Sequence, residues 1–197
     1  MLGGRDLVVL RPRDADALID EHAFEHEEFL PYWAELWPSG LALARRVAVR
    51  ALHGARTLEL GCGLGLPSLA AALAGGRVLA TDWSPQAISL LRDNAERNGI
   101  ALEAERADWS APDPLVARAP WDLVLGADLL YERRNADLLL PLLARLLGPA
   151  SELWLADPGR PPAGPFLEAA AEHFEIDAAT DPLLPQGAVL RLRPGPS

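Results

Sequence analysis

The stretch LELGCGLGLPS (58–68) decides the fold of this chain. A short apolar run leads into Gly61, Gly63 and Gly65, and a helix-forming segment follows directly. Glycine is needed where a backbone turns at positive φ or where a ligand approaches it closely, and the first turn of a helix offers free N–H groups. The stretch therefore predicts a strand, a ligand-binding turn and a helix.

The spacing of these glycines argues against a dinucleotide. It is GxGxG, whereas a dinucleotide-binding loop requires GxGxxG. Glu59 stands two residues before the first glycine in an otherwise apolar strand, where a pyrophosphate would gain nothing from a negative charge. S-adenosylmethionine carries an amino group and a sulfonium but no phosphate. We expect Glu59 to contact that amine directly or through water, or to order the loop backbone; the alternative is that it only caps the neighbouring helix.

Two further acids stand where ligand contacts are expected. Asp82 ends the next strand-like run, where an acid can accept both hydroxyls of a ribose, and Trp83 lies beside it. Asp108 ends a third run and precedes Trp109, so the pair offers an acceptor for an adenine amino group and an indole face for the base. Asp82 could instead cap the helix that starts near Ser84. Acids at the ends of successive strands favour the ligand-binding interpretation.

Strand-like and helix-like segments alternate along the rest of the chain. Strands are expected at 57–60, 77–82, 101–108, 121–128, 151–157, 174–179 and 187–193. Helices are expected at 14–30, 41–52, 67–74, 84–98, 135–147 and from the proline-rich stretch 157–165 to 173. Hydrophobic periodicity and the Gly and Pro residues that bound the segments support these assignments.

This order predicts a Rossmann-like α/β fold. Seven strands form a mostly parallel sheet with helices on both faces, and the two adjacent C-terminal strands form an antiparallel hairpin at one edge. Ligands of such sheets bind at the carboxyl ends of the strands, near the switch point. The 197 residues fit a single domain, 1–197, with an N-terminal helical and aromatic segment, 1–52, and a seven-stranded core, 53–197.

Composition restricts the partners and the compartment. The net charge of -10 and a pI near 4.8 leave no broad basic face for nucleic acid, so a cationic partner suits the chain better. Cys62 is the single cysteine, which excludes an intramolecular disulfide and a cysteine-based zinc cluster and is typical of a cytoplasmic protein. The sequence contains no apolar stretch of about 20 residues, so it predicts no membrane span. We expect a cytoplasmic monomer that binds neither nucleic acid nor membrane.

These motifs together resemble the seven-β-strand S-adenosylmethionine-dependent methyltransferases. The motifs that carry the resemblance are ExGCGLG starting at Glu59, the strand-end Asp82, the pair Asp108–Trp109 and GADLLYE (126–132). Further motifs resemble the protein-lysine branch, and the electron-transfer-flavoprotein β-subunit lysine methyltransferase group in particular. These are PYWAELWPSG (31–40), the DxxY pattern of Asp128 and Tyr131, and DPGRP (157–161).

The resemblance implies a transferase that N-methylates lysine side chains of a protein substrate, with S-adenosylmethionine as cofactor and S-adenosylhomocysteine as product. It also implies cofactor contacts: the methionine part for Glu59, Gly61, Gly63 and Gly65, the ribose for Asp82 with Trp83 beside it, and the adenine for Asp108 and Trp109. By the same resemblance, Trp37 closes over the cofactor from the N-terminal segment, and Asp128 and Tyr131 face the incoming amine as the catalytic pair.

Methyl transfer to an amine requires an aligned, neutral nucleophile and the exclusion of water. The proton of a lysine ammonium could pass to Asp128, to Tyr131 or to bulk solvent, and we favour a positioning role for Asp128. A small-molecule amine is an alternative acceptor. A cofactor-binding module without activity is another alternative, although such a module would not need the polar pair.

A competing motif lies in the N-terminal segment. His22, Glu25 and His26 form HxxEH, which could bind zinc and make the chain a hydrolase. No third ligand is evident in the sequence, and the motif lies on an acidic, surface-type helix outside the predicted sheet. We therefore expect no metal site.

Overall fold

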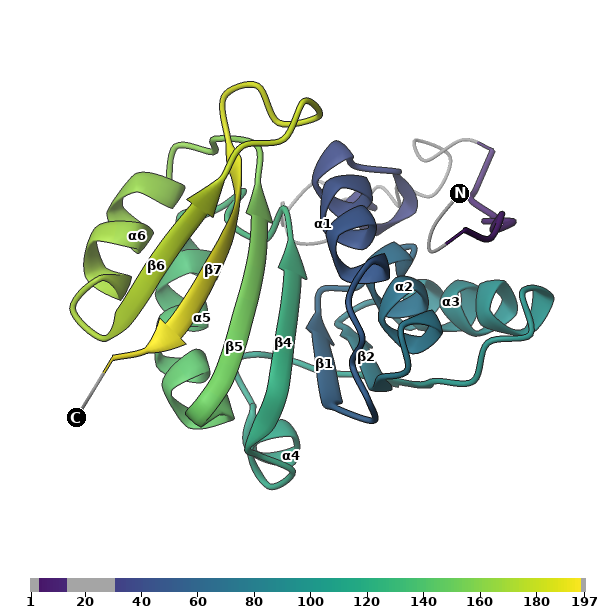
Figure 1. Ribbon diagram of the computed structural model, residues 1–197, viewed down its shortest axis with the longest axis horizontal. Helices are drawn as coiled ribbons and strands as arrows, with labels where there is room; N and C mark the ends of the chain where they lie inside the picture. The colour runs from purple at the N-terminus through teal and green to yellow at the C-terminus, as the bar shows by residue number, and fades with distance from the viewer. Residues whose placement is uncertain (1–3, 14–30, 196–197) are drawn as a thin grey trace, which may run out of the picture.

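The structure is a computed structural model that describes residues 4–13 and 31–195. A seven-stranded sheet in the order β3-β2-β1-β4-β5-β7-β6 forms its centre (Figure 1). The strands are β1 (Arg56–Leu60), β2 (Arg77–Asp82), β3 (Glu103–Arg106), β4 (Trp121–Ala127), β5 (Leu147–Asp157), β6 (Phe174–Ala179) and β7 (Ala188–Pro194). Neighbours from β3 to β5 are parallel, whereas β7 runs antiparallel to both β5 and β6. The predicted parallel sheet and C-terminal antiparallel hairpin are confirmed.

Helices cover both faces of this sheet. They are the 3₁₀ helix η4 (Tyr32–Ala34), α1 (Pro38–Ala48), α2 (Leu66–Leu73), α3 (Pro85–Arg97), α4 (Asp113–Val116), α5 (Arg133–Leu146) and α6 (Ala163–Ala170). One layer contains α1, α2 and α3, and the opposite layer contains α5 and α6 (Figure 1). Within residues 4–13 and 31–195, no helix has the length and apolar character needed to cross a membrane.

The central strands are buried on both faces, because successive side chains of a strand point to opposite sides. On β4, Val124 joins the cluster beneath α5 and α6. Its neighbours Leu123 and Leu125 join the cluster beneath α1 and α2. Both faces are therefore filled by packing, and the carboxyl ends of the strands are where a ligand can reach the sheet.

Some element boundaries differ from the sequence predictions. Helix α1 starts at Pro38 rather than at residue 41, because proline is favoured in the first helical turn. Strand β3 covers 103–106 rather than 101–108, so Asp108 lies past its end. Strand β5 starts already at Leu147, where α5 has just ended. The helix predicted at 14–30 lies outside the described residues.

Asn94 of α3 and Asn98, the C-cap residue of that helix, fasten residues 5–10. The Asn98 amide accepts the N–H of Val8 at 2.9 Å and donates to the Val8 carbonyl at 2.8 Å. The Asn94 amide accepts the N–H of Leu10 at 2.7 Å and donates to its carbonyl at 3.1 Å. Both asparagines are buried, so these main-chain groups are their partners in place of water.

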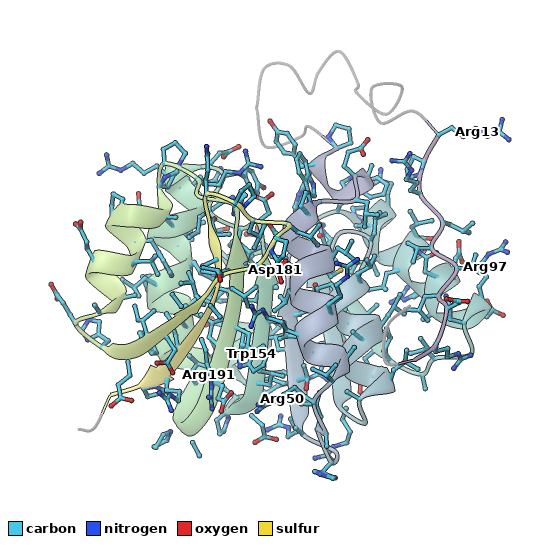
Figure 2. The ribbon with its side chains drawn as sticks, turned by 45° about the horizontal axis from the view of Figure 1, so that its top comes forward. Arg13, Arg50, Arg97, Trp154, Asp181 and Arg191 are labelled. Atoms are coloured by element: carbon cyan, nitrogen blue, oxygen red, sulfur yellow. The ribbon has the colours of Figure 1, made fainter. Side chains whose placement is uncertain are left out.

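A polar network on the α1 side joins that helix to the sheet (Figure 2). The Arg50 guanidinium, just past α1, lies 5.0 Å from the centroid of the Trp154 ring on β5. The Trp154 Nε1 donates to Glu152 at 2.9 Å, and Arg191 on β7 donates to the same carboxylate at 2.9 Å. The network therefore joins β5, β7 and the residues just past α1.

Candidate functional site

A pocket of about 560 Å³ opens at the carboxyl ends of β1, β2 and β4. Its volume is within the range of small-molecule sites. All the residues that the sequence predicted for the site line it: Trp37, Glu59, Gly61, Gly63, Gly65, Asp82, Trp83, Asp108, Trp109, Asp128 and Tyr131. Parallel strands bring their carboxyl ends to one edge, which explains this convergence. The individual contacts assigned to these residues stay predictions.

The loop between β1 and α2, residues 61–65, is called the glycine loop below. It has glycine where other residues would be strained or would collide. Gly63 has φ +50°, and an added β-carbon would lie 3.1 Å from the carbonyl oxygen of Trp33. Gly65 has φ +74°, and its added β-carbon would lie 2.2 Å from the Leu91 side chain. The main chain of the N-terminal segment and helix α3 can therefore approach the loop only because these positions lack side chains.

Glu59 is buried under this loop and faces the first turn of α2. Its Oε2 accepts the backbone N–H of Ser68 at 2.9 Å and also the Ser68 hydroxyl. Burial raises the pKa of Glu59 to about 8. A carboxyl group thus occupies the helix N-terminus, where a phosphate would sit in a dinucleotide site. The helix-capping contact is present, and the contact with a ligand amine stays a prediction.

Asp82 joins two loops at the end of β2. Its Oδ2 accepts the N–H of Gly63 and its Oδ1 accepts the N–H of Ser84, both at 2.9 Å. The hydroxyl of Ser84 in turn accepts the N–H of Ala87 at 3.3 Å, so Ser84 is the N-cap residue of α3. Burial raises the pKa of Asp82. A carboxylate has further lone pairs beyond these two bonds, so it could still accept ribose hydroxyls.

Asp108 is more exposed than Asp82 and lies in the turn after β3. Its Oδ1 accepts the Ser110 N–H at 2.8 Å and the Ser110 hydroxyl at 2.6 Å. These bonds lower the pKa of Asp108, so its carboxylate stays ionised. Trp109 follows it and packs against the core cluster while lining the pocket.

Asp128, just past β4, is paired with Arg160. The Arg160 Nε donates to Oδ1 at 2.8 Å and its Nη2 donates to Oδ2 at 3.1 Å. Asp128 itself has φ +56°, and its N–H donates to the Ala156 carbonyl at 2.8 Å. The Asp157 Oδ1 accepts the N–H groups of Gly159 and Arg160, each at 2.8 Å, which fixes the turn that carries the arginine.

Aromatic rings border the part of the pocket lined by Asp128 and Tyr131, which we call the acceptor end. The Tyr32 and Tyr131 rings lie 5.2 Å apart between centroids, and burial raises the pKa of Tyr131. The Trp37 Nε1 donates to the Tyr32 carbonyl at 2.8 Å. The Arg160 guanidinium lies 5.6 Å from the centroid of the Trp37 ring. Residues 32–37, the aromatic segment, therefore contact the acceptor end from outside the sheet.

Sequence reasoning did not single out Tyr32 or Arg160 as site residues, although both line the pocket. The motifs PYWAELWPSG (31–40) and DPGRP (157–161) contain them and were the available signal. Neither motif indicates that the arginine would pair with Asp128, because that pairing depends on β4 and β5 being neighbours.

The charge of the pocket suits a cationic ligand. Its carboxyl groups are Glu35, Glu59, Asp82, Asp108, Asp128 and Glu132, and its guanidinium groups are Arg106, Arg134 and Arg160. Carboxyl groups therefore outnumber guanidinium groups in the lining, even if Glu59, whose pKa is about 8, is left out. Such a lining fits a ligand with amino and sulfonium groups better than one with phosphates.

Within the part of the chain that the structure describes, no group of His, Cys, Asp and Glu side chains is arranged to hold a metal ion. The HxxEH motif at 22–26 lies outside that part.

Comparison with known proteins agrees with this architecture. A family model described as "Lysine methyltransferase" matches residues 31–168. The electron transfer flavoprotein beta subunit lysine methyltransferase of Xenopus laevis is 37% identical over 136 residues, which are 66% of this chain and 53% of that protein. The EEF1A lysine methyltransferase 3 of Mus musculus is 32% identical over 154 residues, 74% of this chain and 66% of that protein. The chain thus spans about half to two thirds of the length of these relatives.

A solved structure shows the same fold at low sequence identity. The TehB-like SAM-dependent methyltransferase from Corynebacterium glutamicum is 19% identical, with a TM-score of 0.60, covering 88% of this chain and 96% of that one. This likeness concerns the arrangement of helices and strands. The family match extends from the aromatic segment to helix α6 and includes the glycine loop, the strand-end acids and the DPGRP turn. The chain belongs to the lysine methyltransferase family.

Proposed function

We propose that this chain is an S-adenosylmethionine-dependent methyltransferase that N-methylates a lysine side chain of a protein. The observation that carries the proposal is the glycine loop, in which Glu59 occupies the start of α2 and Asp82 accepts the N–H of Gly63. A buried carboxyl group at this position suits an amine better than a pyrophosphate. Family membership and the named activities of the relatives support the same reaction.

Each part of the pocket has a proposed task. Glu59 and the loop glycines hold the methionine part, Asp82 accepts the ribose hydroxyls beside Trp83, and Asp108 with Trp109 binds the adenine. Trp37 and the N-terminal segment, 1–52, close over the cofactor while the core, 53–197, carries the other contacts. When bound, S-adenosylmethionine supplies a methyl group activated by its sulfonium.

The chain's own residues then have to align the amine and keep water out. Both carboxylate oxygens of Asp128 accept bonds from Arg160, and the raised pKa of Tyr131 keeps its hydroxyl protonated at neutral pH. We therefore assign positioning to these two side chains and the removal of the amine proton to solvent. The net charge of -10 suits a protein partner with a basic segment. We further propose that the chain is a cytoplasmic monomer that acts on neither nucleic acid nor membrane.

Two experiments test the proposal. In calorimetry, S-adenosylhomocysteine should bind with a dissociation constant of micromolar order, and Gly63→Arg should abolish the heat. In a thermal-shift assay, the same compound should stabilise the protein, whereas NADH and zinc should not. Absence of binding by the wild-type chain would refute the cofactor.

The acceptor is tested with tritiated S-adenosylmethionine and lysate from a strain that lacks the enzyme. We expect a labelled protein band in which mass spectrometry finds methyl-lysine. Label confined to small molecules would favour a free amine as acceptor, and label on RNA would contradict a protein substrate.

A further inference from the structure

Three segments that are far apart in the sequence meet at Arg160. Its side chain pairs with Asp128 after β4, its backbone follows β5, and its guanidinium covers the ring of Trp37 before α1. We propose that Arg160 is a positioning residue that holds the aromatic segment on the acceptor end of the pocket. The cover of the cofactor and the geometry of Asp128 then depend on one side chain. This proposal deepens the proposed function and rests on it.

The arginine is held at both of its ends. Two donors on one edge of the guanidinium, Nε and Nη2, bond to the two oxygens of Asp128 at 2.8 and 3.1 Å. Such a bidentate pair fixes the plane of the guanidinium as well as its position. The backbone N–H of Arg160 is held by Asp157 at 2.8 Å. The guanidinium that lies over the Trp37 ring is therefore already held in place by Asp128 and Asp157.

The aromatic segment contacts the acceptor end at two points. Trp37 lies under Arg160, and the ring of Tyr32 lies against that of Tyr131. The hydrogen bond from the Trp37 indole to the Tyr32 carbonyl, 2.8 Å long, links the two points. On its other side the segment reaches the glycine loop, where the carbonyl oxygen of Trp33 would lie 3.1 Å from a β-carbon added to Gly63. The segment thus bridges the loop and the acceptor end.

An ordinary surface ion pair would not hold a distant segment in this way. Arg193 of β7 forms such a surface pair, which serves for comparison. Arg193 donates to Asp177 at 2.8 Å, and its side chain is 38% exposed against 34% for Arg160. However, the Asp177 side chain is 63% exposed, whereas that of Asp128 is 6% exposed. Exposed pairs contribute little, so Arg193→Met is a matched control for Arg160→Met.

The first test measures hydrogen exchange of the peptide 31–40 in the protein without ligand. Arg160→Met should speed its exchange at least threefold, whereas Arg193→Met and the β1 peptide of either variant should match the wild type. Arg160→Lys, which keeps a cation but loses the planar fork, should give an intermediate rate and guards against misfolding of the methionine variant. Unchanged exchange in Arg160→Met, with the fold intact by circular dichroism, would overturn the proposal.

The second test is a double-mutant cycle on the affinity for S-adenosylhomocysteine. Arg160→Met and Trp37→Leu should each weaken binding by roughly tenfold, as expected for loss of a partly buried cation–π contact and its ion pair. The double variant should have the same affinity for S-adenosylhomocysteine as the single variant with the lower affinity, because both changes release the same segment. If the two losses of affinity multiply in the double variant, Arg160 and Trp37 act independently and the proposal is contradicted. If exchange depends on Arg160 but the wild type binds no S-adenosylhomocysteine, the positioning role stands and the proposed function fails.

Discussion

At the scale of single residues, two buried acids beside the loop between β1 and α2, Glu59 of β1 and Asp82 of β2, set the character of the site. Burial raises the pKa of Glu59 to about 8, and the carboxylate of Asp82 adds to the rise. The bonds from Ser68 act in the opposite direction but do not cancel the effect of burial. The Glu59 carboxyl is therefore protonated at neutral pH until a positive charge lies beside it.

This shift has a consequence for stability. Glu59 binds a proton more tightly in the folded protein than in the unfolded chain, so its contribution makes the protein less stable as pH rises from about 4.5 to about 8. Relative to Glu59→Gln, the wild type should lose about 1 kcal/mol of unfolding free energy per pH unit in this window. Urea denaturation of both proteins at several pH values measures the difference. Parallel curves for the two proteins would show that Glu59 does not titrate in this range.

The two strand-end acids should differ in what their removal costs. Asp82→Ala leaves two backbone N–H groups without their acceptor at a buried position, which should cost about 1–3 kcal/mol of stability. Asp108→Ala removes bonds to Ser110 at an exposed turn and should change stability by less than about 0.5 kcal/mol. Each variant should weaken S-adenosylhomocysteine binding by about 5- to 150-fold, measured by calorimetry. Full affinity in both variants would disprove the ribose and adenine assignments.

At the scale of elements, the glycine loop works by letting its neighbours approach. Gly65 is the N-cap residue of α2 and adopts a left-handed conformation, with φ +74°. Leu91 of α3 fills the space where its side chain would stand. The loop thus positions two helices relative to β1, and it sets the floor of the pocket at the same time.

Gly65 and Gly99 allow the cost of backbone strain to be separated from the cost of a steric collision. Gly99 also has a left-handed φ, +62°, but nothing lies within 4 Å of an added β-carbon. Gly99→Ala should therefore cost roughly 1 kcal/mol from backbone strain alone. Gly65→Ala should cost about 2–4 kcal/mol, because its β-carbon also collides with Leu91. Thermal denaturation of the two variants tests this order, and equal losses would mean that α3 moves away without penalty.

The sequence predicted the elements that carry the site better than it predicted their contacts. The strand ending in Asp82 has the predicted bounds, because an apolar run between glycine and a helix-capping serine leaves little freedom. The region around Asp108 was predicted as strand, yet β3 ends at Arg106, since Ser110 draws the aspartate into a turn. A local sequence pattern locates a turn only when the residues that form the turn belong to the pattern.

At the scale of the whole molecule, the parallel sheet and the C-terminal hairpin could be predicted from the alternation of elements, whereas contacts between distant segments could not. Alternating strands and helices permit few right-handed arrangements, so the parallel sheet and the late hairpin could be predicted. The pairing of Asp128 with Arg160 spans 32 positions and requires β4 to lie beside β5. The attachment of Val8 to Asn98 spans 90 positions and involves side-chain amides that no periodic pattern marks.

The neighbouring attachment of Leu10 to Asn94 gives a prediction for the stability of the whole chain. Asn94→Ala removes both bonds to Leu10 from a fully buried position, so the unfolding free energy should fall by about 1–3 kcal/mol. Exchange of the Leu10 amide should become faster in the same variant. Glu96→Ala, an exposed change on the same helix, is the control and should alter neither measurement. Protection of the Leu10 amide in Asn94→Ala would show that the segment is held by other contacts.

Asn94 and Asn98 bind main-chain groups of residues 8 and 10, whatever side chains those residues carry. The Val8 side chain is 61% exposed, so position 8 can accept any amino acid except proline, which lacks the N–H. Leu7 and Val9, which pack against the core, must remain apolar. A synthetic decapeptide that keeps those two side chains could then replace the deleted N-terminus in trans, which makes this contact a place to divide the chain into two complementing fragments.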